Sequence, residues 1–216
     1  MSRLGAWAEL LRVSALFTVP GDALAGAAAT GRRPNRGTAL ALGASLCLYP
    51  AGMALNDWAD RAEDAAERPS RPIPSGRISP PAALAAAAGL TVAGVALASC
   101  AGRAAGVTAG ALAGTVWAYD LALKHTKAGP AAMAAARSLD LLLGAVATHP
   151  AGARAALLPA AVLGGHTMSV TVVSRRETTG GSTAVPLAAL AATAAVSTVT
   201  GRPRGTAHAP AGPAAA

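Results

Sequence analysis

The sequence predicts an all-α protein, a polytopic bundle of about seven transmembrane helices around a central cavity. Two observations lead to this fold class. Of the 216 residues, 53% are hydrophobic and only 13% are charged, and alanine-rich apolar segments of about 20 residues recur between short clusters of charge. A soluble, alanine-rich helical bundle is the alternative. It would need a polar face on most of its helices, and segments 80–101 and 154–173 have almost none.

Each apolar segment has about the length that a bilayer requires. The first lacks a clear small-residue cleavage site, so we expect it to be retained as a helix. It contains Asp22, which we expect to face the cavity, with an interrupting turn after Pro20 and Gly21 as the alternative. The second ends in a cluster of acids, and the fourth ends in an aromatic and basic stretch. The expected helices are 10–31, 38–58, 80–101, 103–123, 130–149, 154–173 and 183–200.

The fifth expected helix begins with two opposite charges. Arg137 and Asp140 are three residues apart, so they can pair on one helical face, and an ion pair within a membrane is expected to face the bundle interior. Taken together, residues 1–200 are expected to form a single transmembrane domain. The tail 201–216 is rich in Pro, Gly and Ala and is expected to be disordered.

Positive charge predicts the orientation of the bundle. Basic residues gather in the second, fourth and sixth turns between helices, which share one side with the amino terminus, and fewer lie on the other side. This distribution predicts an integral, multi-pass protein of the bacterial cytoplasmic membrane with those turns in the cytoplasm. The net charge of +8 follows from this topology and from anionic lipid or substrate, so nucleic acid is not needed as a partner. The basic residues are Arg3, Arg12, Arg61, Arg68, Arg71, Arg77, Lys124, Lys127, Arg175 and Arg176.

The end of the second helix carries the most informative pattern. Asp57, Asp60 and Asp64 are spaced i, i+3, i+7, and Asn56 joins them at i−4 from Asp60, so a continuous helix would turn all four side chains in one direction. Crowded carboxylates repel one another unless a cation lies between them. Hard oxygen ligands without Cys or His favour Mg²⁺. The alternative is an ordinary solvated helix end.

A loop with three prolines and three arginines follows the acids directly. Residues 67–77 cannot be helical, because proline breaks the helix and pushes the preceding residue toward extended conformations. Arginine binds phosphate oxygens in a bidentate manner. The acids and this loop together therefore predict a metal and diphosphate site.

These two motifs resemble those of a known family. Residues 56–64 read N-D-x-x-D-x-x-x-D and residues 68–76 read R-P-x-R-P-I-P-S-G, which together resemble the first aspartate-rich motif of the UbiA-type intramembrane prenyltransferases. The resemblance implies that Asn56, Asp57, Asp60 and Asp64 hold Mg²⁺ and that the arginines bind the diphosphate. It also implies a diphosphate-binding role for Tyr119 and Lys124 in the fourth turn. Without the resemblance, an interfacial aromatic with snorkelling lysines explains that turn equally well.

Two features depart from the family pattern. The family usually has a second D-x-x-x-D motif after the sixth helix, whereas this chain has Arg175, Arg176 and Glu177 there, with one carboxylate for a second metal. The two arginines can replace part of the missing positive charge. The resemblance also covers about residues 10–200, which leaves no room for the last two of the nine helices common in the family. We therefore expect a compact or truncated relative, or one that needs a membrane protein partner.

The resemblance implies Mg²⁺-dependent transfer of an isoprenoid from a polyprenyl diphosphate to a small-molecule or lipid acceptor whose identity the sequence does not reveal. The catalytic candidates are Asp57, Asp60 and Asp64, and Glu177 is a further metal ligand. A non-catalytic membrane protein that binds or carries a prenyl diphosphate, as part of a biosynthetic or export assembly, is the first alternative. A soluble class I terpene synthase is the second, and the hydropathy argues against it. The expected substrate ligands are Asn56, Arg68, Arg71, Tyr119, Lys124, Arg175 and Arg176.

Overall fold

The computed structural model describes residues 2–177, and this part of the chain is helical, without strands. The expected helix 183–200 and the tail 201–216 lie outside the described residues. The α-helices are α1 (Arg3–Leu10), α2 (Pro20–Ala29), α3 (Arg36–Ala59), α4 (Arg61–Glu67), α5 (Pro80–Ala101), α6 (Arg103–Ala118), α7 (Gly129–Thr148) and α8 (Leu157–Glu177), and the tighter or wider helical turns are η1 (Val13–Thr18), η2 (Tyr119–Leu123) and η3 (Pro150–Ala156).

The predicted helix boundaries hold best where local signals are strong. Helix α5 covers the predicted 80–101, since Pro80 opens it and Gly102, at φ 140°, ends it in a conformation that favours glycine. Asn35 caps the start of α3 through its side chain, which accepts hydrogen bonds from the backbone of the first turn. The sixth helix begins three residues later than predicted, because a short 3₁₀ segment, η3, precedes α8.

The predicted first helix, 10–31, is wrong as a continuous element. Helix α1 ends at Leu10, Arg12 takes a left-handed backbone conformation at φ 52°, and η1 follows before Pro20 starts α2. The two parts, Arg3–Leu10 and Val13–Ala29, are bent by 43° relative to each other. Proline lacks the backbone N–H that a continuing helix would use, so it favours a new start at this position.

Four helical segments in residues 2–177 are long and apolar enough to cross a membrane: α3, α5, α7 and Pro150–Arg175. The bent segment formed by α1, η1 and α2 would make a fifth. Helix α6 has 16 residues, and η2 extends it by a π-helical turn. The membrane-bundle class is therefore confirmed, whereas the predicted count of seven spans is only approximate.

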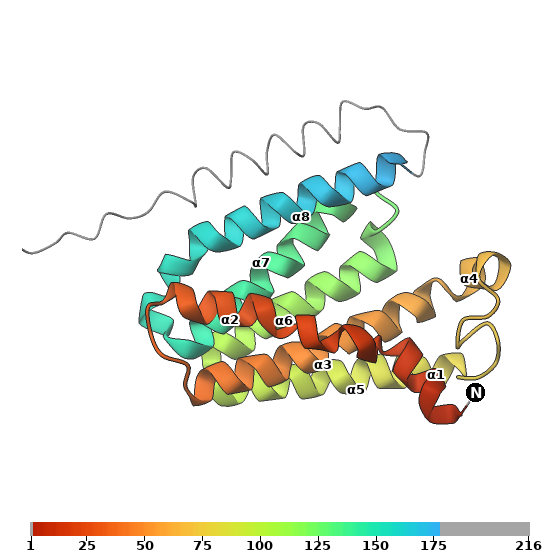
Figure 1. Ribbon diagram of the computed structural model, residues 1–216, viewed down its shortest axis with the longest axis horizontal. Helices are drawn as coiled ribbons and strands as arrows, with labels where there is room; N and C mark the ends of the chain where they lie inside the picture. The colour runs from red at the N-terminus through yellow and green to blue at the C-terminus, as the bar shows by residue number, and fades with distance from the viewer. Residues whose placement is uncertain (1, 178–216) are drawn as a thin grey trace, which may run out of the picture.

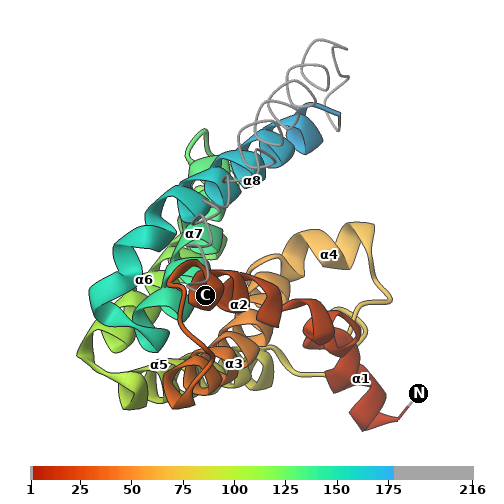
Figure 2. The ribbon, with the colours of Figure 1, turned by 60° about the vertical axis from the view of Figure 1, so that its left-hand side comes forward.

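Helix α7 lies at the centre of the bundle. It packs against α2, α3, α6 and α8, while α3 runs beside α5 and α5 beside α6 (Figures 1 and 2). The amino terminus, α4, the end of α6 and the end of α8 lie at the same end of the bundle (right in Figure 1). The turns that carry the predicted positive charge therefore share one end. That this end faces the cytoplasm stays a prediction.

Small residues allow α2 and α7 to touch through their backbones. A Cβ added at Gly144 would collide with the backbone of Ala23, and one added at Gly26 would collide with the backbone of Leu141. Apolar lipid gives little hydrophobic drive for helix association, so close backbone packing is a main source of stability in membrane bundles. This contact fixes the position of α2 along the axis of α7. It thereby places Asp22 beside Arg137.

We expect Gly144→Leu to destabilise the bundle by about 3 kcal/mol, the upper part of the usual range for overpacking, because a backbone cannot move aside as a side chain can. Thermal unfolding in detergent measures the effect. Gly114→Leu is the matched control, since an added Cβ at Gly114 on α6 meets nothing within 4 Å. Equal loss of stability in both variants would contradict the assignment of this contact.

Candidate functional site

The predicted acid-bearing helix does not continue through Asp64. Helix α3 ends at Ala59, and Asp60, at φ −86° and ψ 4°, joins it to α4. The hydrogen bonds from Asp60 N to Asn56 O (2.9 Å) and from Asp64 N to Asp60 O (2.8 Å) keep the two helices in contact. This change of direction separates the acids, so the prediction that all four side chains point one way is wrong.

Asp57 and Asp64 converge on one arginine of the proline-rich loop. Arg71 Nη1 lies 3.3 Å from Asp57 Oδ1 and 2.7 Å from Asp64 Oδ2. Both carboxylates are buried, with 4% and 0% of the residue exposed. Burial acts to lower the pKa of Arg71, but the hydrogen bond to Asp64 and the charges of Asp57 and Asp60 outweigh it and raise that pKa. Arg71 is therefore a permanent cation between two buried anions.

Two further arginines approach this pair. Arg12 Nη2 lies 3.5 Å from Asp57 Oδ1, and Arg68 Nε lies 3.1 Å from Asp64 Oδ1. Arg12 was not among the predicted site residues. Its left-handed backbone, which is uncommon for a residue other than glycine, turns the chain between α1 and η1 beside Asp57. No local signal in the sequence indicates this contact across 45 positions.

Asp64 Oδ1 is buried and receives no hydrogen bond from the described residues, although Arg68 Nε lies nearby. The arginine thus supplies charge without an aligned N–H. A buried anionic oxygen without a donor is unusual, and a hard cation can satisfy it. The oxygen-only set of Asn56, Asp57, Asp60 and Asp64 therefore fits Mg²⁺ chemically, provided that the arginines exchange some of their contacts.

The other two residues of the motif turn toward the end of α6. Asn56 donates through Nδ2 to Asp120 Oδ1 at 2.9 Å, and Lys124 Nζ pairs with Asp60. The π-helical turn η2 carries Asp120 and sets Lys124 just beyond its end, where Lys124 N donates to Tyr119 O at 2.9 Å. Such wide turns are frequent at functional sites. The structure thus brings Lys124 to the acids, as predicted, and adds the buried Asp120, which sequence reasoning missed.

The acids and bases at this end are matched in number among these residues. Asp57, Asp60, Asp64 and Asp120 carry the negative charges, and Arg12, Arg68, Arg71 and Lys124 carry the positive charges. Every one of the three motif aspartates already has a cationic partner. Binding of a metal and a diphosphate would therefore be an exchange of partners, in which the carboxylates turn to the metal and the cations turn to the phosphate oxygens.

Arg175, near the end of α8, contacts the turn that follows η2. Its guanidinium donates to Thr126 O at 2.7 Å and to Lys124 O, so it holds this turn through its backbone. Arg176 and Glu177 end α8, and their side chains lie outside the described part of the chain. The predicted roles of Arg176 and Glu177 therefore stay predictions, as does direct contact of Arg175 with a diphosphate.

A second set of possible metal ligands lies beside Lys124. Single ligand atoms of Asp60, Glu63 and His125 are all within 4.8 Å of one another. Glu63 and His125 are exposed, and an imidazole ligand suits a transition metal better than Mg²⁺. His125 is remote from α4 in the sequence, and the turn after η2 brings its imidazole to Asp60 and Glu63.

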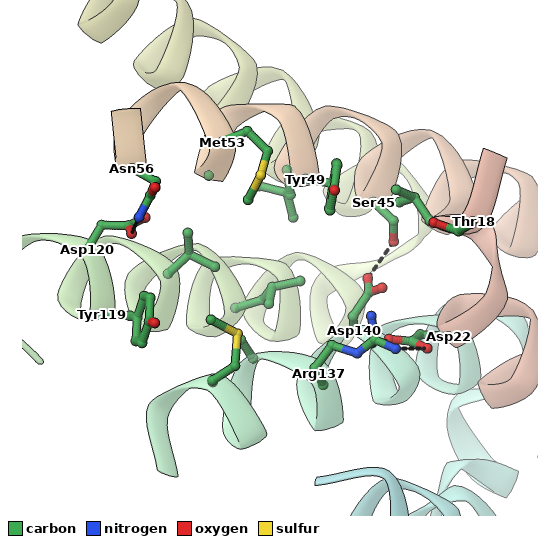
Figure 3. A pocket seen from close by; sticks show the side chains of 17 residues that line it. Thr18, Asp22, Ser45, Tyr49, Met53, Asn56, Tyr119, Asp120, Arg137 and Asp140 are labelled. Carbon is green, nitrogen blue, oxygen red and sulfur yellow. Dashed lines mark hydrogen bonds and ion pairs between the residues drawn. The ribbon is translucent and has the colours of Figure 1, made fainter. Parts of the chain in front are cut away.

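A chamber of about 360 Å³ extends from the acid-rich end into the bundle (Figure 3). Asn56, Tyr119 and Asp120 line the end nearest the acids, and the diphosphate-binding role of Tyr119 stays a prediction. Farther in, the walls are mainly apolar. The apolar lining residues are Val19, Leu48, Gly52, Met53, Leu112, Val116, Met133 and Ala136.

Charged residues line the other end of this chamber. Arg137 pairs with Asp22 on α2, with Nε 2.9 Å from Oδ2 and Nη2 3.1 Å from Oδ1. The predicted pairing of Arg137 with Asp140 is therefore wrong, because α2 offers a bidentate partner across the helix interface. Asp140 instead accepts a hydrogen bond from Ser45. The prediction that Asp22, Arg137 and Asp140 face a cavity is confirmed.

Together, the fold and the site define an α-helical integral membrane protein in which paired carboxylates and cations lie beside one end of a mainly apolar chamber. The chain belongs to the UbiA prenyltransferase family, whose sequence pattern matches residues 14–181. The match covers most of the chain, including both motifs and the chamber. It confirms the predicted resemblance, and it rules out the soluble terpene synthase.

Relatives of known activity match parts of the chain. Digeranylgeranylglyceryl phosphate synthases are 53% identical over 55 residues (Methanothrix thermoacetophila), 39% identical over 99 residues (Methanopyrus kandleri) and 33% identical over 147 residues (Ignicoccus hospitalis). These matches cover 26%, 44% and 68% of this chain but only 21%, 35% and 48% of the relatives. The chain thus spans at most about half the length of these archaeal relatives, which do not bear on the predicted bacterial source.

Two solved structures have the same fold. One is described as digeranylgeranylglyceryl phosphate synthase in membranes, with a TM-score of 0.67, 23% identity, and coverage of 79% of this chain and 60% of the other. The second is a UbiA homolog from Archaeoglobus fulgidus bound to DMAPP and Mg²⁺, with a TM-score of 0.56, 16% identity, and coverage of 90% and 85%. At these identities the likeness concerns the fold alone.

Proposed function

We propose that this protein transfers an isoprenoid chain from a prenyl diphosphate to an acceptor in a Mg²⁺-dependent reaction. The observation that carries the proposal is the set of carboxylate and cation pairs beside Asn56 and Asp120, which line one end of a mainly apolar chamber. The motif acids suit the metal, the loop arginines and Lys124 suit the phosphate oxygens, and the chamber suits the hydrocarbon. Family membership and the DMAPP and Mg²⁺ in the structural neighbour support the same chemistry.

In this proposal each group of residues has one task. Asn56, Asp57, Asp60 and Asp64 would hold Mg²⁺, which supplies positive charge to the diphosphate when it is bound. Arg68, Arg71 and Lys124 would leave their carboxylate partners and donate to phosphate oxygens. Tyr119, at the end of the chamber nearest the acids, would orient the diphosphate end of the donor. Such preorganised charges act strongly because the chamber excludes water.

The reaction breaks the bond between C1 of the isoprenoid and the diphosphate oxygen, and both bonding electrons leave with the diphosphate. A nucleophilic atom of the acceptor forms the new bond to C1 and loses its proton. The apolar walls would shield the allylic cation character of the donor from water. Arg12, which contacts Asp57, adds a cation that sequence reasoning did not include.

For the acceptor, we propose a glyceryl phosphate that carries an isoprenoid, by analogy with the product named in the relatives. The chain covers too little of those relatives for the acceptor to follow from similarity. The missing second D-x-x-x-D motif leaves Glu177 as the acid in that turn, so Arg175 and Arg176 would supply part of the charge that a second metal supplies elsewhere.

A second candidate is a membrane protein that binds or carries a prenyl diphosphate without turning it over. Two observations favour it: the three motif aspartates are already paired with cations, and the second motif is absent. In this role the carboxylates would bind the metal and the cations would bind the diphosphate, but the bond between the isoprenoid and the diphosphate would not break.

The test is incubation of the membrane-embedded protein with labelled prenyl diphosphates, Mg²⁺ and candidate acceptors, followed by mass spectrometry of the lipid fraction. We expect a prenylated product that disappears when EDTA removes the metal. Mg²⁺-dependent binding of the donor without any product would favour the carrier. No binding of any donor would contradict both candidates.

A further inference from the structure

Asp120 is a buried carboxylate to which the proposed reaction assigns no role. It is 5% exposed, lies on the π-helical turn η2 and lines the chamber together with Tyr119. Its Oδ1 accepts a hydrogen bond from Asn56 Nδ2 at 2.9 Å, and Figure 3 shows the two side chains pointing toward each other. Within residues 2–177 no basic side chain forms an ion pair with Asp120, in contrast to the three motif aspartates. The side chain that this buried acid holds is therefore an amide.

Two contacts with the same spacing join the end of α3 to the end of α6. On the α3 side, Asn56 precedes Asp60 by four residues. On η2 and just beyond it, Asp120 precedes Lys124 by four residues. The first residues of these two pairs contact each other, and so do the second residues. The hydrogen bond from Lys124 N to Tyr119 O makes the turn one residue wider than an α-helical turn, so it sets the register of both contacts.

The contact with Asp120 decides which atom of the Asn56 amide is available to a ligand. An ionised carboxylate only accepts hydrogen bonds, and an amide side chain donates only through its nitrogen. Asn56 therefore turns Nδ2 to Asp120, which leaves Oδ1 on the other side of the amide. Among the residues that the structure describes, none donates a hydrogen bond to this Oδ1. The amide oxygen, the atom that suits a hard cation, is thus fixed in direction and open to a ligand.

We propose that Asp120 is a positioning residue for Mg²⁺, which holds the amide of Asn56 so that Oδ1 and not Nδ2 is presented to the metal; this inference rests on the proposed function. The amide nitrogen is a donor and offers a cation no lone pair. An Asn56 amide turned the other way would therefore be lost as a ligand. Hydrogen-bond partners that orient metal ligands commonly change metal affinity by about 10- to 100-fold when they are replaced.

The Asp120→Asn variant separates this role from simple packing between α3 and η2. Asparagine has the size of aspartate and can still form a hydrogen bond with Asn56. It donates to one orientation of the Asn56 amide and accepts from the other, so it does not select between them. The contact between the two helices is kept, while the direction of the amide is no longer fixed.

The experiment measures the Mg²⁺ concentration that gives half-maximal binding of labelled geranylgeranyl diphosphate to the full chain in nanodiscs. We expect Asp120→Asn to raise this concentration about tenfold, at the lower end of the range for lost partners of metal ligands. The exchange variant N56D/D120N should return it close to the wild-type value, because the exchange keeps the net charge and leaves a carboxylate oxygen at position 56 for the metal.

Asp140→Asn is the matched control. It also neutralises an aspartate that lines the chamber and accepts a hydrogen bond from a side chain, here Ser45, but at the other end of the chamber. Its Mg²⁺ dependence should equal that of the wild type. An increase as large as that of Asp120→Asn would show that any lost charge in the chamber has this effect, which would contradict the proposal.

A double-mutant comparison shows whether Asp120 acts through Asn56. Asn56→Ala should weaken Mg²⁺-dependent binding by itself, because it removes the amide ligand. N56A/D120N should then bind no more weakly than Asn56→Ala, since no amide is left to orient. If Asp120 contacted the metal directly, its replacement would cost about tenfold with or without the amide at position 56.

Four results would overturn the proposal. They are a Mg²⁺ dependence of Asp120→Asn equal to that of the wild type, an unfolded Asp120→Asn protein, an exchange variant no better than Asp120→Asn, and a further loss in N56A/D120N relative to Asn56→Ala. The second would show that Asp120 supports the fold, and the fourth that it binds the metal itself. Absence of Mg²⁺-dependent binding in the wild type would instead contradict the proposed function.

Discussion

Replacement of Asp60 by asparagine is expected to abolish Mg²⁺-dependent binding of a prenyl diphosphate, with a loss of at least about 100-fold, in the range seen when a single preorganised charge contact is removed from an active site. Asp60 connects the acids of α3 and α4 with the end of α6. Its backbone joins α3 to α4, and its carboxylate pairs with Lys124. Asparagine keeps the size of the side chain and can still accept a hydrogen bond from Lys124. The fold should therefore persist while the metal loses a charged ligand.

Titration of donor binding with and without Mg²⁺ measures this effect. Glu67→Gln is the matched control, because it neutralises an exposed acid on the same short helix, α4. Metal-dependent affinity in Asp60→Asn equal to that of the wild type would remove Asp60 from the site. A variant that unfolds in detergent would instead show that Asp60 has a structural role.

Replacement of Arg71 by alanine is expected to destabilise the protein by about 3–5 kcal/mol, the usual cost of breaking a buried ion pair by removing one partner. Asp57 and Asp64 are buried and share this guanidinium, so both carboxylates lose their nearest cation. The raised pKa keeps Arg71 charged throughout the neutral range.

Thermal or denaturant unfolding in detergent measures this loss, and the R71A/D64N variant should recover part of it because the fully buried charge is gone. Arg61→Ala provides the comparison. Arg61 is exposed and stacks on Trp58 at 4.5 Å from the ring centre, a contact worth about 0.5–1 kcal/mol at an exposed site. Equal losses in Arg71→Ala and Arg61→Ala would show that the buried pairs contribute no special stability.

Features set by neighbouring residues could be predicted from the sequence, and features set by contacts between helices could not. Properties that depend on composition and on neighbouring residues were predictable: the helical membrane class, the limits of α5 set by Pro80 and Gly102, and the acids followed by an arginine and proline loop. The joint presence of the two motifs also predicted the family that the match over residues 14–181 then showed. Each of these signals lies within one short segment.

Properties that depend on how helices meet were not predictable. Asp60, at φ −86° and ψ 4°, interrupts the helix between α3 and α4, and the acids are divided between Arg71 and Lys124. Arg12 and Asp120 entered the site from segments 45 and 64 positions away.

The sequence by itself determined the chemical types present, namely hard carboxylate ligands, phosphate-binding arginines and apolar helices long enough for a bilayer. Only the tertiary structure decided which charge pairs with which. Arg137 could pair with Asp140 on its own helix, but the close contact of Gly26 and Gly144 brings Asp22 of α2 alongside α7. The choice of partner depends on the position of α2 along the axis of α7. Small residues set this position through backbone contact, and no local pattern of charge can encode it.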